Sequence, residues 1–343
     1  MKVRLGIVGC GAVAERYHLP AIAALDEVEL VVVCDAAPAR AKAFAAAAGV
    51  AHVAERHTEL VGDVDAAIVA VPNHLHQAVA SDLLRQGVHV LVEKPMAVDV
   101  AQCDAMIEAA REGGAVLAVG HDFRYFPVAT FAKNVLASGV LGSVRRVDLR
   151  QSATGRWPYS SDYIFSPATA GGGVLIDFGV HMLDLLSWWL GESEVTAFRD
   201  DARGGVESEC ELELELQSGA PVWIELSRLR ELRDTVVVEC ECGTVEIGIF
   251  EPAVLRLTLA DGGPALAGDV PDPRFASAPL VTVFTRQLAD FTSAIATRRS
   301  PLVTGADGRR AVATVEAAYS LRGPLRRPWD FPEAYASIGR ERS

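Results

Sequence analysis

Residues 3–14 read Val-Arg-Leu-Gly-Ile-Val-Gly-Cys-Gly-Ala-Val-Ala, and this stretch decides the fold. Residues 3–8 form a short, mostly apolar run typical of a strand, and residues 12–25 are typical of a helix. In the pattern G-x-G-x-x-G/A, the first glycine permits a tight turn and the second lets the backbone approach a pyrophosphate, while the small sixth residue keeps helix and strand close. The helix N-terminus adds amide hydrogens and a positive dipole end for phosphates. The turn here fits that pattern with Gly9, Cys10, Gly11, Ala12, Val13 and Ala14.

The chain that follows repeats the same alternation of strand and helix. Further apolar strands are expected at residues 28–34, 66–71, 88–92 and 115–119, with helices at 38–49, 75–86 and 99–111. Apolar strands that alternate with helices indicate a parallel sheet covered on both faces. Because strand, turn and helix agree, the glycine pattern favours nucleotide binding over a plain tight turn. We therefore predict an α/β fold with a doubly wound Rossmann domain over residues 1–122.

After about residue 144 the pattern changes to strict alternation of apolar and polar residues. Such half-apolar strands predict an open, mainly antiparallel sheet in a C-terminal α+β domain over residues 123–343. Carboxylates at alternate positions of one strand favour a solvated sheet face over a cation site. Residues 262–273 are predicted to be a flexible loop, and closing helices are expected at 281–298 and 309–321. The expected strands are 144–151, 209–216, 221–227, 235–241, 244–250 and 254–259.

Composition narrows the class of protein. The 343 residues suffice for two domains of roughly 150 residues each. Hydrophobic residues make up 50% and charged residues 22%, which excludes global disorder. The net charge of −13 argues against a nucleic-acid-binding face. The chain has no run of 18 uncharged apolar residues, so no membrane span is predicted. The six cysteines form no CxxC pair and are interpreted as reduced thiols. We expect an acidic, cytoplasmic enzyme.

Asp35 stands at the end of the second predicted strand. A carboxylate in that place can accept hydrogen bonds from the adenosine ribose hydroxyls and would repel a 2′-phosphate, which favours NAD over NADP. Arg40 stands nearby and can instead accommodate that phosphate, so NADP remains the alternative. A third interpretation makes Asp35 a helix cap.

Two further motifs carry candidate chemistry. Glu93-Lys94-Pro95 follows a parallel strand, where doubly wound sheets place ligands, and Pro95 suits a cis peptide bond. Asp177, His181 and Asp184 follow a triple glycine at residues 171–173, and their spacing puts them on one helix face. A carboxylate beside an imidazole is a natural proton-transfer unit. The alternatives are an ordinary strand end and a polar helix face that meets the second domain.

Together these motifs resemble the Gfo/Idh/MocA oxidoreductases, which take their name from glucose–fructose oxidoreductase and inositol 2-dehydrogenase. The resemblance covers about residues 3–320 and also includes Pro72-Asn73-His74-Leu75-His76. It implies a Rossmann domain followed by an α/β domain with an open antiparallel sheet. It also implies reversible hydride transfer between nicotinamide and a secondary alcohol of a sugar or cyclitol. A dimer or tetramer built on the sheet face is implied by the same resemblance.

The resemblance further implies roles for matching residues. Lys94 matches the family's catalytic lysine, and Asp177 and His181 match its aspartate and histidine, so that either Lys94 or His181 accepts the hydroxyl proton while Asp177 positions substrate. The nicotinamide side of the cofactor is expected to meet Val71, Pro72, Asn73, His76, Glu93 and Lys94. For substrate binding we expect Lys94, Asp177 and His181 together with the cationic and aromatic residues Arg124, Tyr125, Arg156 and Trp157, each of which is also compatible with structural packing.

Several rival functions are compatible with the same residues. A metal site could draw on three pairs, His74 with His76, His121 with Asp122, and Asp177 with His181, but their order has no standard zinc spacing, so no metal is expected. A nucleotide-sensing regulator without turnover is disfavoured by the presence of Lys94, Asp177 and His181. A permanently bound cofactor used to cleave glycosides, and an NADPH-dependent reductase of a nucleotide-linked or natural-product keto-sugar, both remain alternatives.

Overall fold

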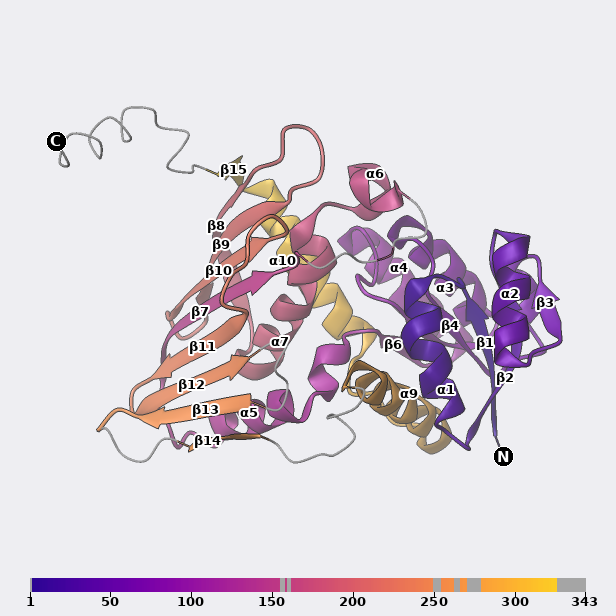
Figure 1. The fold of residues 1–343 in the computed structure, drawn as a ribbon, viewed down its shortest axis with the longest axis horizontal. Coiled ribbons are helices and arrows are strands. Elements are labelled where there is room, and N and C mark those ends of the chain that lie inside the picture. The colour runs from indigo at the N-terminus through magenta and orange to yellow at the C-terminus, as the bar shows by residue number, and fades with distance from the viewer. Residues whose placement is uncertain are drawn as a thin grey trace.

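The computed structural model describes residues 2–154, 158, 162–248, 254–261, 266–269 and 279–325. Its first half is a sheet of six parallel strands in the order β3-β2-β1-β4-β5-β6 (Figure 1). The order reverses between β1 and β4, which is where doubly wound sheets bind ligands. The strands are β1 Val3–Val8, β2 Val28–Cys34, β3 His52–Ala54, β4 Ala66–Val69, β5 His89–Val92 and β6 Leu117–Val119. The helices of this half are α1 Leu19–Ala23, α2 Pro38–Ala48, α3 His76–Arg85 and α4 Val100–Gly113.

The predicted Rossmann architecture is confirmed, with local differences. The helix expected over residues 12–25 contains a π-helical turn at Ala14–His18 before α1. Strand β3 escaped prediction because three residues are too few to show a period. The ends of α2 and α4 follow the expected chemistry, since Gly49 and Gly114 adopt left-handed conformations after the last helical residue.

The second half is one nine-stranded sheet in the order β14-β13-β12-β11-β7-β10-β9-β8-β15 (Figure 1). Most neighbours are antiparallel, as predicted, but β7 pairs with β10 and β8 with β15 in parallel. The first strands are β7 Val144–Ser152, β8 Ser193–Asp200, β9 Glu209–Leu216 and β10 Pro221–Ser227. The others are β11 Thr235–Cys240, β12 Gly243–Gly248, β13 Val254–Leu259, β14 Leu266–Asp269 and β15 Arg322–Pro324.

Three strands of this sheet, β8, β14 and the three-residue β15, correct the sequence prediction. Strand β8 was missed because a register shift between Val195 and Ala197 interrupts the alternation of its side chains. Strand β14 pairs with β13 inside the segment predicted to be a flexible loop. The rest of that predicted loop, residues 262–265 and 270–273, lies outside the described residues.

Helices of the second half pack on the large sheet, and another packs against the first half. α5 Pro127–Ala137, α7 Val180–Leu190 and α10 Gly305–Ser320 lie on the inner face of the large sheet, and the short α6 Pro167–Ala170 lies toward the first half (Figure 1). α9 Pro279–Thr297 returns to the first half, where Leu288 and Phe291 join the hydrophobic cluster of Leu5 and Ile7. A late segment therefore completes the first core, and a division at residue 122 stays a prediction.

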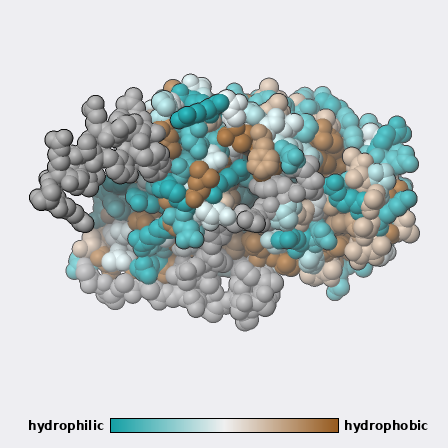
Figure 2. All heavy atoms as spheres, turned by 45° about the horizontal axis from the view of Figure 1, so that its top comes forward, coloured by the Kyte–Doolittle hydropathy of each residue, from teal (hydrophilic) through white to brown (hydrophobic). Residues whose placement is uncertain are grey.

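One helical stretch, Pro167–Leu190, is as long and apolar as a membrane-spanning segment. However, 72% of its most apolar window is buried inside the protein, so its composition is that of a core helix. On the face shown in Figure 2, by contrast, hydrophobic and hydrophilic residues are interspersed.

Candidate active site

The turn after β1 is shaped by Gly9, whose φ is 99°. A Cβ atom there would lie 2.3 Å from the carbonyl oxygen of Ala70, so only glycine fits between the turn and the chain after β4. Ala14 is fully buried, which agrees with the need for a small residue where the helix meets the strand. The Gly11 carbonyl accepts the amide of Glu15 at 3.0 Å as the helix begins. This turn and helix start fit a dinucleotide pyrophosphate.

Asp35 lies beside that turn. Its Oδ2 accepts the amide of Cys10 at 2.8 Å, and its Oδ1 accepts the amide of Ala37 at 2.8 Å. Arg40 Nη1 lies 3.8 Å from Asp35 Oδ2, with its side chain 39% exposed. Asp35 therefore stabilises the turn. Asp35 and Arg40, which the sequence analysis gave as alternative determinants of cofactor preference, lie side by side. The thiol of Cys10 is a packing group, because burial raises its pKa to about 12.

β4 lies next to β1 and β5 lies beyond β4, and the carboxyl ends of these two strands carry the other predicted cofactor residues. After Pro72, Asn73 Nδ2 donates to the carbonyl oxygen of Ala170 at 2.8 Å, which ties this edge to α6. The ring nitrogens of His76 lie 2.8 Å from the carbonyl oxygens of Pro95 and Val71. His76 is 1% exposed and holds two strand ends together, so its contact with cofactor stays a prediction.

Glu93 and Lys94 follow β5, and the Lys94–Pro95 peptide bond is cis. Glu93 Oε1 lies 2.7 Å from Nε2 of the buried His18. Burial alone would raise the pKa of Glu93, but the hydrogen bond and charge of His18, with Lys94, hold that pKa below its usual range. Sequence reasoning missed His18, because nothing in a helix after the glycine turn marks it as a partner of a distant strand end.

Lys94 crosses from the first half of the protein to the second. Its Nζ donates to the main-chain oxygen of Asp177 at 2.8 Å and lies 3.2 Å from Asp177 Oδ1. Arg228 Nη2 lies 2.5 Å from Asp177 Oδ2, so two cations share this carboxylate. Asp177 lies in a π-helical turn, Leu175–Gly179, just before α7. Turns of this kind are rare and concentrate at functional sites.

His181 faces a different carboxylate from the one that its spacing suggested. Its Nδ1 lies 3.3 Å from Asp122 Oδ1, and its ring stacks on Phe123 with centroids 4.4 Å apart. Burial, Lys94 and His121 hold the pKa of His181 well below its usual value. Burial and the charge of Glu93 raise the pKa of Asp122 to about 8. At neutral pH the pair is thus an uncharged imidazole beside an uncharged carboxyl group.

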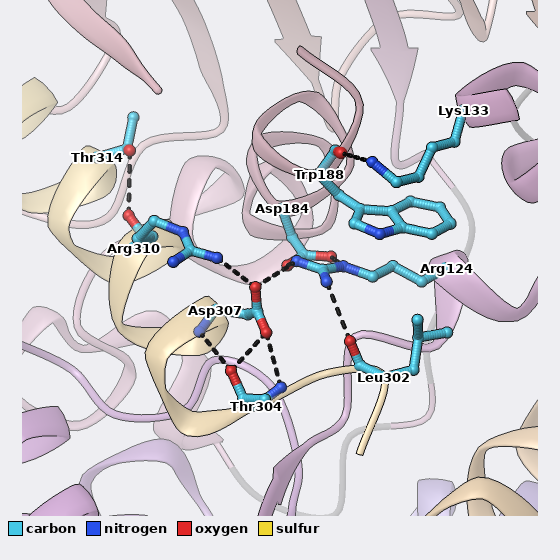
Figure 3. Close-up of polar contacts among 9 residues, drawn as sticks. All are labelled: Arg124, Lys133, Asp184, Trp188, Leu302, Thr304, Asp307, Arg310 and Thr314. Carbon is cyan, nitrogen blue, oxygen red and sulfur yellow. Dashed lines mark hydrogen bonds and ion pairs between the residues drawn. The ribbon is translucent and has the colours of Figure 1, made fainter. Parts of the chain in front are cut away.

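Two predicted substrate residues lie in protein packing instead of an open cleft. Arg124 is 2% exposed, and its guanidinium binds both oxygens of Asp184 at 2.7 and 2.6 Å and lies 3.1 Å from Asp307 (Figure 3). The Tyr125 hydroxyl donates to Asp290 at 3.0 Å. A buried guanidinium needs such carboxylates, and α7 and α10 supply them. Arg156 and Trp157 lie outside the described residues.

The structure thus gives Asp177, His181 and Asp184 three different partners, where the spacing predicted one shared face. Spacing along a helix fixes only the direction of a side chain, whereas its partner comes from whichever segment packs there. Besides His18, sequence reasoning missed Arg228 at this site, and it considered Asp122 only as a metal ligand, not as the partner of His181. In the described part of the chain, no group of three or more His, Cys, Asp and Glu residues could hold a metal ion.

Two family models match the chain. Residues 3–121 match the model described as "Oxidoreductase family, NAD-binding Rossmann fold", and residues 130–246 match the "GFO/IDH/MocA C-terminal domain". The chain belongs to the Gfo/Idh/MocA oxidoreductase family. The first half of this Gfo/Idh/MocA protein is accordingly an NAD-binding Rossmann domain, as the glycine turn predicted.

Curated relatives of this Gfo/Idh/MocA protein act on sugars. The 1,5-anhydro-D-fructose reductase of Ensifer adhaerens is 28% identical over 91% of this chain and 93% of its own. The D-glucoside 3-dehydrogenase of Escherichia coli is 28% identical over 70% of this chain and 75% of its own. The dTDP-3,4-didehydro-2,6-dideoxy-alpha-D-glucose 3-reductase of Streptomyces violaceoruber is 35% identical over 55% of each chain. The chain thus spans only about half the length of the two curated relatives that it matches at 35–36% identity.

Solved structures agree with the fold. The aldose-aldose oxidoreductase of Caulobacter crescentus, solved with glycerol, is 28% identical and superposes with a TM-score of 0.82 over 94% of this chain and 97% of its own. A 3-ketoreductase of Actinomadura kijaniata, solved with NADP, has the same fold, with a TM-score of 0.82 at 23% identity over 96% of this chain and all of its own.

Proposed function

We propose that this protein is an NAD(P)-dependent oxidoreductase that transfers a hydride between a secondary alcohol of a sugar or cyclitol and nicotinamide. One observation carries the proposal. Lys94 follows a strand at the cofactor edge, and its Nζ reaches Asp177 of the second half at 2.8 and 3.2 Å. A polyol bound between the two halves would therefore meet a cation, a carboxylate and an imidazole at the edge where nicotinamide is expected.

Each residue of the site has a separate role in the proposed hydride transfer. Bound cofactor supplies the acceptor or donor of the hydride. Lys94 and His181 are the two candidates for the group that takes the hydroxyl proton, and the other would hydrogen-bond the substrate oxygen. His181 is uncharged at neutral pH, as a proton acceptor must be. Asp177 is held by Lys94 and Arg228, so that it can orient neighbouring hydroxyls of the substrate.

The first substrates to test are pyranosides that react at carbon 3. Relatives named for reaction at that position include a D-glucoside 3-dehydrogenase and a glucose-6-phosphate 3-dehydrogenase. Inositol 2-dehydrogenase of Rhizobium meliloti, 29% identical over 57% of this chain, adds cyclitols to the screen. Release of free sugar from a glycoside would instead favour transient oxidation with a permanently bound cofactor.

A second candidate is reduction of a nucleotide-linked keto-sugar with NADPH. Arg40 favours it, because its guanidinium stands 39% exposed beside Asp35 and can meet a 2′-phosphate. The dTDP-keto-sugar 3-reductase relative adds support.

A titration of cofactor-free protein with NADH and NADPH, followed by nicotinamide fluorescence, separates these candidates. Preference for NADH supports the dehydrogenase and the role of Asp35, whereas preference for NADPH supports the reductase and Arg40. Binding of neither contradicts both. Cofactor binding without turnover, unchanged in Lys94→Ala, would favour a nucleotide-sensing regulator.

A homodimer or homotetramer formed through the large sheet is part of the proposal. Among the described elements, the helices lie on the inner face of that sheet (Figure 1). On its outer face the guanidinium of Arg150 lies 4.9 Å from the ring centroid of Trp223, a pair suited to a polar interface. Light scattering after gel filtration tests it, and a monomer at micromolar concentration would contradict it.

A further inference from the structure

Glu207 is a fully buried carboxylate that the proposed chemistry does not use. Its Oε1 accepts the amide of Gly173 at 2.9 Å and the amide of Leu175 at 3.1 Å. The main-chain oxygen of Glu207 accepts the amide between them, that of Val174, at 2.9 Å. One residue therefore binds three consecutive amides at the start of the helix that carries the site. These are the amides that a helix cannot satisfy from within itself.

Two residues from α10 and β15, Tyr319 and Arg322, hold the Glu207 carboxylate in place. The hydroxyl of Tyr319, on α10, donates to Oε1 at 2.7 Å. Arg322 Nη2 lies 3.4 Å from Oε2. Burial raises the pKa of Glu207, whereas these hydrogen bonds and the positive end of the helix dipole favour its ionised form.

Two glycines of the triple glycine are required by this arrangement. A Cβ on Gly173 would lie 1.9 Å from the main-chain oxygen of Glu207, and a Cβ on Gly172 would lie 2.0 Å from the Tyr319 hydroxyl. The sequence indicated that something approaches this helix closely. The structure identifies protein groups, Glu207 and Tyr319, as what approaches it.

The segment anchored by Glu207 is hydrogen-bonded to Asp177 of the site. Gly173 gives its N–H to Glu207 and its carbonyl oxygen to the amide of Asp177, at 3.0 Å. Asp177 lies in the π-helical turn, where its own carbonyl oxygen accepts Lys94 Nζ at 2.8 Å. Uncommon backbone conformations persist only where the surroundings hold them. Glu207 is the charged side chain that holds the amides on which this turn begins.

We propose that Glu207 is a positioning residue: it anchors the first amides of the site helix, and so fixes the π-helical turn that presents Asp177 to Lys94. Its side chain binds Gly173, Leu175, Tyr319 and Arg322, not Lys94 or His181, so it acts through the helix and not on substrate. The inference rests on the proposed function, because its consequence for turnover presumes that Lys94 and Asp177 do the chemistry.

The test compares Glu207→Gln and Glu207→Ala with a matched control, Glu246→Gln. Glu246 is an ion-paired glutamate on β12 of the large sheet, with Arg233 and Arg256 as partners. Both Glu207 variants are expected to lower kcat on the order of 10- to 100-fold at temperatures where they remain folded, since small misplacements in a site cost that much. Glutamine keeps an oxygen for the amides, so it should rescue part of the loss that alanine causes. Cofactor affinity should be unchanged.

Hydrogen–deuterium exchange supplies a readout independent of turnover. We expect residues 172–182 to exchange faster in Glu207→Gln than in the wild type or in Glu246→Gln. A Glu207→Gln variant that melts earlier yet keeps its kcat while folded would overturn the inference and leave the proposed function intact. If the wild type turns over no sugar, the proposed function fails, and unchanged exchange at 172–182 would overturn the anchoring as well. Should Glu207→Ala not fold, Tyr319→Phe replaces it, with a smaller expected loss.

Discussion

Two pairs of an acid and a base meet in this site, and they differ in how much water reaches them. The side chains of Lys94 and Asp177 are 21% and 29% exposed, whereas those of His181 and Asp122 are each 7% exposed. Lys94 and Asp177 form an ion pair, in which Arg228 adds a second cation. In the other pair, burial favours the uncharged forms, since it lowers the pKa of His181 and raises the pKa of Asp122 to about 8.

The difference shows how one site can hold two kinds of chemistry. An ion pair with some access to water keeps fixed charges that can orient a substrate and meet a developing negative oxygen. A dry, uncharged pair can take up or give a proton near neutral pH.

The largest effect is expected from removal of the cation. Lys94→Ala should lower turnover on the order of 10²- to 10⁴-fold, because a positioned proton-transfer or oxygen-binding group contributes about that much. The affinity for NADH should hardly change, since the glycine turn after β1 remains. Steady-state kinetics and cofactor titration measure the two quantities. His181→Phe is the matched change on the uncharged pair, and wild-type turnover in both variants would refute the proposed roles.

The next largest effect is expected on protein stability, from the buried ion pair of Arg124 near His181 and Asp122. Arg124 is a neighbour of Asp122 and Phe123 in sequence, and its pairing with Asp184 is buried to 2% and 1% exposure. Arg124→Leu leaves the buried Asp184 without its cation and leaves Asp307 with Arg310 alone, so it should cost about 3–5 kcal/mol of unfolding free energy. Denaturant titration measures it. The exposed pair Arg145–Glu241 is the control, where Arg145→Ala should cost about 0–1 kcal/mol. Equal costs at the two places would contradict this account of burial.

The smallest effect is a change in pH dependence. The Asp122 carboxyl group is uncharged below its pKa of about 8 and ionised above it. A carboxylate beside His181 favours a charged imidazole, so alcohol oxidation should rise through pH 8. Asp122→Asn stays uncharged at every pH and should lose this rise by several-fold at pH 9. The ratio of wild-type to variant kcat at each pH isolates the effect, and a ratio independent of pH would speak against it.

Much of the fold could be predicted because its information is local. Strands β1 and β2 begin and end where their apolar runs do, and the glycine turn has the required steric reason at Gly9. Asp35 and Lys94 could be placed at strand ends, because parallel strands bring their carboxyl ends to one edge. Strand β8 could not be predicted, since its bulge removes the alternation on which the prediction depends.

The residues proposed for the site could be named in part for the same reason. Lys94, Asp177 and His181 belong to motifs that can be recognised in one short stretch. Arg124 looked like a substrate residue, because an arginine between aromatic residues carries no sign of Asp184 and Asp307, which lie 60 and 183 residues farther along the chain. Arg228 carries no motif, and nothing in the sequence pairs Asp122 with His181, so only the contacts reveal these two partners.

The sequence by itself therefore determined the two architectures, the cofactor edge and the residue types that the site has to work with. These follow from periodicity, glycine sterics and strand ends, all of which act over a few residues. Only the tertiary structure decided which carboxylate meets which base, and which of these groups are charged. That outcome depends on burial and on partners from distant segments, because the free energy of a charge is set by everything within a few ångströms of it.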